Sequence, residues 1–178
     1  MNEFQAYEYT VKPRCDSALL VKRICLIVSY ALLAVLVLAL GVVTRIFVPL
    51  IALLPISIWV FVYFTWRYVD VEFEISVTSG VLTVSKIYGR RSRKTVFEAP
   101  IKVMSTIAPY TDENAEKIER FAPKISYSAL SSSNSENAYF ALFETEEEEK
   151  AIFIFDTDGE GGKILKIFKF YNSVAFSR

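Results

Sequence analysis

The sequence predicts an α+β protein in which a two-helix transmembrane hairpin comes before a β-rich region that ends in a C-terminal helix. Three observations support this prediction: a 43-residue stretch, Ile24–Trp66, with a single charge; alternation of polar and apolar residues from Asp70; and an amphipathic pattern over residues 160–176. The expected organisation is an N-terminal cytoplasmic segment 1–23, a hairpin 24–66 and a β domain 67–178.

The apolar stretch is too long for one membrane-spanning helix and long enough for two. One span takes about 20 residues across a hydrocarbon core of roughly 30 Å. Arg45, the only charge, divides the stretch into 24–44 and 46–66, each of 21 uncharged residues. We therefore expect a short turn at Gly41–Arg45, and Pro55 predicts a kink or a local break in the second span.

The distribution of Lys and Arg around the hairpin predicts its orientation. Both flanks carry several cations and the turn carries only Arg45, so the positive-inside rule places both termini in the cytoplasm and the turn outside. Tyr63, Trp66 and Tyr68 cluster where the second span should leave the bilayer, as an interfacial aromatic belt does. The sequence thus predicts a protein of the cell membrane with two spans.

The region after the hairpin is predicted to form about seven short antiparallel strands and a small helix. Val71–Val77 alternates apolar and polar residues, Thr78–Gly80 forms a turn, and Val81–Tyr88 is a second strand. A helix is expected over 112–122, from Asp112 as N-cap to the stop at Pro123. The remaining strands are expected at 93–98, 102–108, 125–130, 138–143 and 151–155.

The last predicted element is an amphipathic helix over 160–176. Ile164, Leu165 and Phe168 lie on one side of it, and the lysine stripe (Lys163, Lys166 and Lys169) lies on another. The apolar side could plug the open corner of a strongly bent sheet. The lysine stripe fits either a membrane contact or, as we expect, the solvated face of the helix.

These elements and their motifs resemble bacterial membrane proteins that carry a pleckstrin-homology (PH)-like domain. The resemblance covers nearly the whole chain and is carried by Glu72–Ile75, Thr78-x-Gly80-x-Leu82-Thr83-Val84 and Lys86–Lys94. Met104–Tyr110 looks like the Ile-x-x-Ala/Ile-Pro segment of an uncharacterised clostridial-type family of this design. The resemblance implies a PH-like antiparallel β-barrel or sandwich capped by the C-terminal helix, and it brings no catalytic residues with it.

A basic turn between the second and third strands is the main candidate site. It contains Lys86, Arg90, Arg91, Arg93 and Lys94 within nine residues. The first strand leaves the membrane and the second returns, so this turn should point back towards the bilayer, where each cation gains about 1 kcal/mol from anionic headgroups. A lipid-facing clamp and plain positive-inside topology both remain open. Eukaryotic PH domains carry their phosphoinositide-binding cations in the first hairpin, whereas these cations lie in the second, and this difference argues against an inositide ligand.

Composition excludes several classes of function. The sequence has no histidine, which removes Ser-His-Asp and Cys-His catalysis and His-ligated metals, and we expect no catalytic residues, cofactor or metal. Twenty basic and twenty acidic residues leave no net charge, so nothing indicates nucleic-acid binding. Cys15 and Cys25 are not expected to form a disulfide; Cys15 is either an acylation site or an ordinary small residue.

Three further motifs receive structural interpretations. Asp156–Gly161 is similar to the opening of a calcium loop, but Ile167 stands where the bidentate glutamate belongs, so a turn capped by Asp158 is expected. Gly159–Lys163 fails the spacing of a phosphate loop. The glutamates of Glu144–Glu149 are expected to form a solvated turn between two strands.

Three functional hypotheses follow. The first is a non-enzymatic, membrane-anchored interaction or scaffold protein whose cytoplasmic PH-like module binds a protein partner or anionic lipid headgroups. The alternative is an accessory subunit or modulator of a membrane transporter or channel that acts through its helices, although the absence of charge within the spans argues against an ion relay. An enzyme is the third, and the sequence offers no convergent carboxylates for it.

Overall fold

The computed structural model describes residues 6–13, 17–69, 71–89, 91–132, 135–145, 147–157 and 162–176. The chain divides into two compact units that are not contiguous in sequence. The β-rich unit comprises Met1–Arg14, Glu72–Ile87 and Arg93–Arg178, and the helical unit comprises Cys15–Val71 and Tyr88–Ser92. The β-rich unit therefore begins before the apolar helices, where the sequence indicated only a possible short strand, Tyr7–Val11, outside the predicted β domain.

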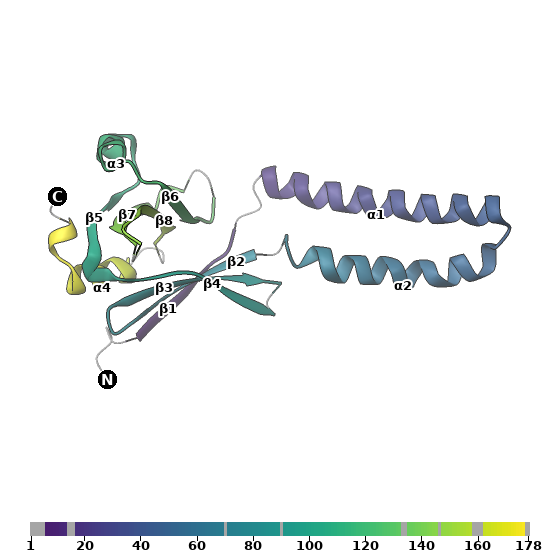
Figure 1. The fold of residues 1–178 in the computed structure, drawn as a ribbon, viewed down its shortest axis with the longest axis horizontal. Coiled ribbons are helices and arrows are strands. Elements are labelled where there is room, and N and C mark those ends of the chain that lie inside the picture. The colour runs from purple at the N-terminus through teal and green to yellow at the C-terminus, as the bar shows by residue number, and fades with distance from the viewer. Residues whose placement is uncertain are drawn as a thin grey trace. The chain divides into compact units, whose positions relative to one another are not determined.

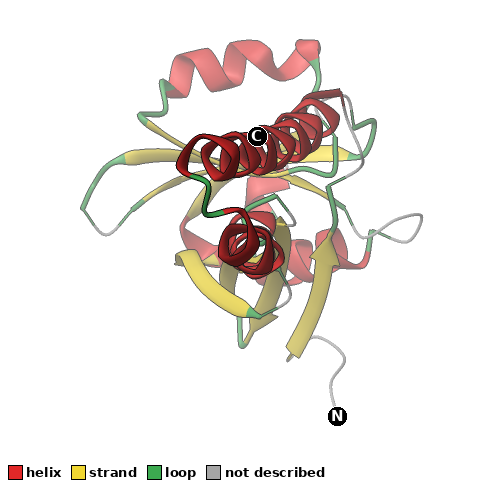
Figure 2. Ribbon diagram, turned by 90° about the vertical axis from the view of Figure 1, so that its right-hand side faces the viewer, coloured by secondary structure: helices red, strands yellow, loops and turns green. Residues whose placement is uncertain are grey.

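The helical unit is built on an antiparallel pair of helices, α1 (Ser17–Thr44) and α2 (Phe47–Trp66). Figures 1 and 2 both show them side by side. Both expected spans lie within these helices apart from Ile46, and α1 begins seven residues before the predicted start. α2 continues through Pro55 without a local break, and the alternative that was predicted, a kink, stays a prediction.

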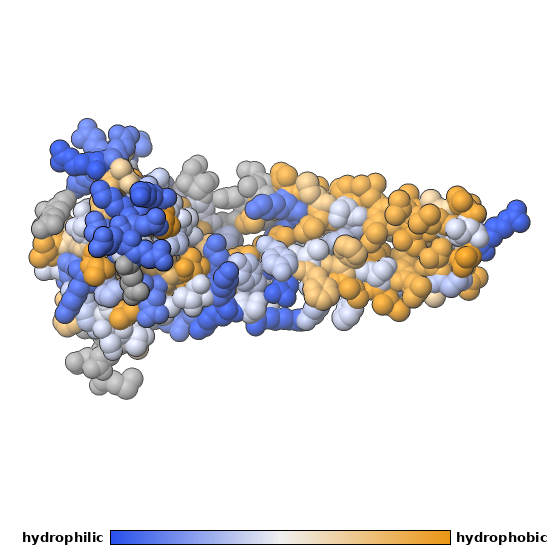
Figure 3. Space-filling view, in the orientation of Figure 1, coloured by the Kyte–Doolittle hydropathy of each residue, from blue (hydrophilic) through white to orange (hydrophobic). Residues whose placement is uncertain are grey.

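The surface of this helical pair is apolar. Both helices are long and apolar enough to cross a membrane, and only 6% and 0% of their most apolar windows are buried. Figure 3 shows hydrophobic side chains along the visible face of the pair. A core helix of a soluble protein would bury this surface, so these helices lack the packing that such a role requires.

A hydrogen bond between side chains links the two helices. The hydroxyl groups of Tyr30 and Thr65 form a hydrogen bond. Thr65 Oγ1 also donates to the carbonyl of Phe61 at 2.6 Å, so Tyr30 is the donor to Thr65.

The first sheet of the β-rich unit has the strand order β1-β2-β3-β4. Its strands are β1 (Ala6–Val11), β2 (Val71–Thr78), β3 (Val81–Tyr88) and β4 (Ser92–Pro100). β1 pairs antiparallel with β2 in a register that runs from Ala6 opposite Thr78 to Val11 opposite Phe73. The helical hairpin is thus inserted in the chain between two neighbouring strands of one sheet.

The β2–β3 turn has the backbone that the sequence indicates. Ser79 and Gly80 both have positive φ angles, 53° and 83°. Two such residues form the type I′ turn, whose twist matches that of the flanking strands. A Cβ at Gly80 would lie 2.8 Å from Cδ1 of Tyr171, so this position also needs glycine for space.

The second sheet has the order β5-β7-β8-β6 and is mixed. Its strands are β5 (Met104–Pro109), β6 (Ile125–Ala129), β7 (Ala138–Glu144) and β8 (Lys150–Asp156). β6 pairs parallel with β8 because α3 (Ala115–Phe121) carries the chain across before β6 begins. Of the expected antiparallel barrel or sandwich, the barrel is wrong, because the two four-stranded sheets do not close into one, and the strands are not all antiparallel, because β6 pairs parallel with β8.

The C-terminal helix α4 (Lys163–Tyr171) contributes to the core of the β-rich unit, as expected, although it is shorter than predicted. Ile164, Ile167 and Phe168 are fully buried, whereas Leu165 is only partly buried. The lysines of the lysine stripe are exposed. After α4, Asn172 Nδ2 donates to the carbonyls of Ile101 and Met104 at 3.0 and 2.8 Å and so ties the helix end to the start of β5 and the residues just before it.

Candidate functional site

Three aromatic side chains lie near the C-terminal end of α2. Trp59, Tyr63 and Trp66 follow one another at spacings of four and three residues, which puts them on one face of a helix. The rings of Trp59 and Tyr63 stack with their centroids 5.8 Å apart. All three side chains are exposed, at 67%, 44% and 38%. An exposed row of this kind is typical of a helix that ends at a membrane–water interface.

The turn between β3 and β4 brings a cation to this aromatic row. The backbone N–H of Arg91 donates to the carbonyl of Tyr88 at 3.2 Å and closes the turn. The guanidinium carbon of Arg91 lies 4.9 Å from the centroid of the Tyr63 ring, within the range of a cation–π contact. Arg91, Tyr63 and Tyr88 all belong to the helical unit.

A second cation, Arg67, follows directly after α2. Its guanidinium carbon lies 5.1 Å from the centroid of the Tyr68 ring, and its Nη2 donates to Ser92 Oγ at 3.5 Å. Its Nε is buried and has no hydrogen-bond partner among the described residues. A buried donor left without an acceptor costs about 1–3 kcal/mol, so this position calls for an oxygen acceptor.

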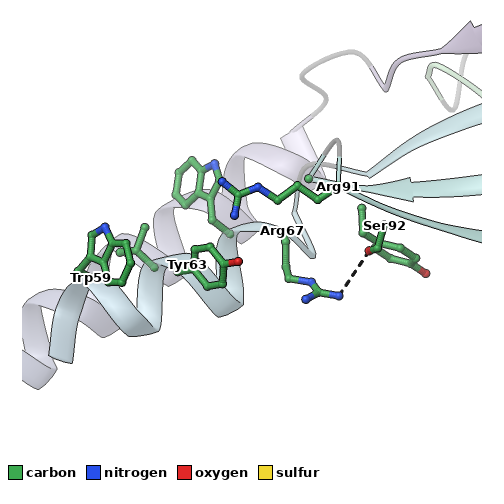
Figure 4. Close-up of a pocket in the computed structure, with 9 residues that line it drawn as sticks. Trp59, Tyr63, Arg67, Arg91 and Ser92 are labelled. Atoms are coloured by element: carbon green, nitrogen blue, oxygen red, sulfur yellow. Dashed lines mark hydrogen bonds between the residues drawn. The ribbon is translucent and has the colours of Figure 1, made fainter. Parts of the chain in front are cut away.

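These side chains surround a half-open cavity of about 360 Å³, which we call the arginine–aromatic cavity (Figure 4). Two guanidinium groups and several aromatic rings line it, and none of the described lining residues has a carboxylate. The residues that define its character are Trp59, Tyr63, Trp66, Arg67, Tyr88 and Arg91. The cavity can therefore accept a ligand with an anionic group at one end and an apolar group at the other.

The predicted basic residues that the structure describes make different contacts. Arg91 lines the arginine–aromatic cavity, whereas Lys86 Nζ lies 5.4 Å from the centroid of the Phe73 ring within the β-rich unit. Arg93 forms an ion pair with Glu74, and Lys94 is exposed. Arg90 lies outside the described residues.

Sequence reasoning did not single out Arg67 or Trp59 as site residues. The available signal was positional: Arg67 is the first charge after the second apolar span, and Trp59 lies two helical turns before it.

Arg93 takes part in an ionic cluster on the first sheet in which Glu74 is buried and Arg93 and Glu8 are exposed. Its guanidinium contacts Glu74, and its Nη2 lies 3.9 Å from Glu8 Oε1. The side chain of Glu74 is only 5% exposed. Burial raises the pKa of Glu74, and the nearby Glu8 carboxylate raises it further, while Arg93 opposes both effects. Arg93 therefore has a structural role, because it pairs with the buried carboxylate of Glu74.

A second cavity, of about 420 Å³, lies beside Asp156 in the β-rich unit. The carboxylate oxygen Oδ2 of Asp156 accepts a hydrogen bond from the backbone N–H of Ser131 at 2.6 Å, and its backbone carbonyl accepts one from Tyr9 at 2.8 Å. The rest of the calcium-like motif, Asp158–Gly161, lies outside the described residues. Among those that are described, no group of three or more Cys, Asp or Glu side chains is placed to hold a metal.

Comparison with known proteins identifies the family. The model of the family described as "Bacterial PH-like domain (DUF6106)" matches residues 5–173, which include β1, both apolar helices and α4. No match was found among curated proteins or among solved structures. The predicted resemblance to bacterial PH-like proteins is confirmed, and its clostridial detail stays a prediction. Because the match spans nearly the whole length, the chain belongs to this uncharacterised family of bacterial PH-like domain proteins.

Proposed function

We propose that this protein is a non-enzymatic interaction module held at the cell membrane by its helical hairpin. In this proposal α1 and α2 cross the bilayer, the Arg45 turn lies outside, and both termini lie in the cytoplasm. The observation that supports it most strongly is the exposed apolar surface of both helices, only 6% and 0% of whose apolar windows are buried. Exposing that surface to water would be costly, and a bilayer removes the cost.

The family supports the second half of the proposal. PH-like domains commonly mediate contacts with proteins or lipids, and the β-rich unit has the two sheets and C-terminal helix of such a module. In this proposal the module binds a protein partner or the anionic headgroups of the inner leaflet. Of the predicted basic residues, Arg91 has the placement that best supports a headgroup contact, because Arg93 is already paired within the module.

Cysteine accessibility in intact bacterial cells tests the proposal. In a Cys15→Ser, Cys25→Ser background, Arg45→Cys should react with a membrane-impermeant maleimide, and Ser173→Cys should react only after the membrane is permeabilised. Alkaline carbonate should leave the protein in the membrane. Release by carbonate would reject the anchor, and labelling of Ser173→Cys in intact cells would reject the orientation. Crosslinking in native membranes would then search for a protein partner.

A further inference from the structure

The described residues that line the arginine–aromatic cavity carry positive charge that they do not neutralise among themselves. Arg67 and Arg91 both line the cavity, and no Asp or Glu is among its lining residues in the part of the chain that the structure describes. The hydrogen bond from Arg67 Nη2 to Ser92 engages one guanidinium donor, whereas the buried Nε of Arg67 has no acceptor among the described residues. A guanidinium presents its donors as a planar fork that matches the oxygens of a phosphate. The missing partner is therefore an anionic oxygen group.

The other end of the cavity is apolar. Trp59 and Val62 line it one to two helical turns before Arg67, and eight residues of helix span about 12 Å along the axis. A small inorganic anion would reach only the arginine end. A ligand that uses the whole cavity needs an anionic group joined to an apolar chain, and the volume of about 360 Å³ falls in the range of small-molecule sites, about 300–1,000 Å³.

The place of the cavity in the chain favours a lipid. It lies at the end of an apolar helix, where Trp and Tyr side chains mark the level of the headgroups. Among the described residues that line the cavity there is no carboxylate, so these residues offer no ion-pair partner to the ammonium of a zwitterionic headgroup. The chemistry therefore fits a glycerophospholipid whose headgroup carries a net negative charge.

We propose that the arginine–aromatic cavity binds one anionic phospholipid, with its phosphate between Arg67 and Arg91 and an acyl chain along Trp59 and Tyr63. This inference rests on the proposed membrane anchor and names the lipid class and the residues that recognise it. The cation–π contact with Tyr63 orients the Arg91 guanidinium, and Ser92 holds that of Arg67. The site lies within the helical unit and does not need the exposed Lys94 of β4.

The two tryptophans of the chain, Trp59 and Trp66, both line the cavity, so tryptophan fluorescence reports on it directly. The full chain would be reconstituted in two kinds of bilayer. One contains a small fraction of brominated phosphatidylglycerol in phosphatidylcholine, and the other contains a small fraction of brominated phosphatidylcholine in phosphatidylglycerol. A bromine atom quenches a tryptophan that its acyl chain touches. We expect brominated phosphatidylglycerol to quench a larger fraction of the tryptophan fluorescence than its mole fraction in the bilayer would give. This preference for phosphatidylglycerol should weaken as the salt concentration is raised.

Variants assign the preference to the two arginines. Arg67→Gln and Arg91→Gln should each reduce the preference for phosphatidylglycerol about tenfold, since a hydrogen bond to a charged group contributes about that factor. Lys94→Gln, which removes an exposed cation of β4, should leave it unchanged. Because Arg67 is partly enclosed, its replacement could disturb folding, so far-UV circular dichroism must show that the variant keeps an intact fold. Arg91 is exposed, so its replacement is the variant less sensitive to this problem.

Three outcomes would overturn the inference. They are equal quenching by both lipids in the unaltered protein, an equal loss in Lys94→Gln, and full competition by millimolar inorganic phosphate, which would indicate a site for a soluble anion. Carbonate extraction of the same membranes separates the two proposals, because the anchor stands if the protein is retained even when no lipid preference is found.

Discussion

Gly89 packs against the backbone of Arg67. A Cβ at Gly89 would lie 3.0 Å from the Cβ and 3.2 Å from the Cα of Arg67, and Gly89 has a φ of +56°. The contact joins the β3–β4 turn to the residue that follows α2. The turn can bring Arg91 to the arginine–aromatic cavity only while this close approach is kept.

Gly89→Ala should therefore disturb the cavity without unfolding the β-rich unit. The left-handed backbone costs a residue with a side chain about 1–2 kcal/mol, and the added methyl group must also displace backbone atoms of Arg67. We expect a shift in tryptophan emission and a loss of the phosphatidylglycerol preference. Thr95→Ala, at an exposed position of β4, is the control. Unchanged emission and lipid preference in Gly89→Ala would show that the close approach does not position the turn.

The sequence predicted local features of the fold better than distant pairings. β3 was predicted with its observed bounds, Val81–Tyr88, because alternation and a Ser-Gly turn are local signals. The parallel pairing of β6 with β8 could not be predicted in this way, since it depends on the crossover through α3. The pairing of β1 with β2 likewise joins strands that 59 residues separate in the chain, from Val11 to Val71.

The candidate site was predicted only in part, for the same reason. Alternation along β2 predicted a polar face that includes Glu74, but Glu74 is 4% exposed and binds Arg93. Arg93 is therefore engaged in a contact between two strands and is not free to act with the rest of the basic turn. No local sequence pattern predicts this contact. Arg67 was missed as a site residue because its role depends on the turn at Gly89, which lies 22 residues further along the chain.

The buried carboxylate of Glu74 predicts a specific pH dependence of stability. Its pKa is raised in the folded state, mainly by burial and then by Glu8, so folding favours its protonated form. Its contribution to stability is fully present below the ordinary pKa, 4.5, and is lost as the pH rises through the folded value. The Glu74→Gln variant lacks this loss.

Urea unfolding of the full chain in neutral detergent, at several values between pH 4 and pH 7, checks this prediction. The stability of Glu74→Gln relative to the unaltered protein should rise with pH over the lower part of the range and then level off. Glu72→Gln, on the same strand, removes a carboxylate that lies 3.7 Å from the exposed Lys12 and should not reproduce that rise. A relative stability that falls with pH would mean that Arg93 outweighs the burial of Glu74.

Asn172 should be a main determinant of how α4 is held. Its side-chain amide donates to the carbonyls of Ile101 and Met104 at 3.0 and 2.8 Å and, more weakly, to that of Lys102 at 3.4 Å. Its Oδ1 accepts from the N–H of Ala175 at 3.2 Å. Asn172→Ala leaves the partly buried groups among these without partners, at about 1–3 kcal/mol for each that stays unsatisfied. Hydrogen exchange measured by mass spectrometry should show faster exchange along Lys163–Tyr171.

A matched control is Asn114→Ala, because the amide of Asn114 donates to the carbonyl of Pro109 at 3.1 Å at the surface of the protein. This variant should cost less than about 1 kcal/mol, since water replaces the lost bond. Equal protection of α4 in the Asn172→Ala and unaltered proteins would show that apolar burial alone holds the helix.

The insertion of the hairpin between β1 and β2 predicts where the chain can be cut and rejoined. Val11 is 6% exposed and lies opposite Phe73, so a fragment of residues 67–178 lacks a strand of its own sheet. Antiparallel neighbours need a loop of only about 2–5 residues, so residues 1–13 joined by four Gly/Ser residues to 71–178 should restore the pairing. We expect the spliced protein to be soluble and to unfold cooperatively, and the 67–178 fragment to unfold at lower temperature or aggregate through the exposed edge of β2.

The control is a spliced protein with Val11→Asp, which places a charge at this buried position and should lose most of the gain in thermal stability. Equal thermal stability of the spliced protein and the 67–178 fragment would show that β1 is dispensable, and the anchor would then be an appendage to the module instead of an insertion within it.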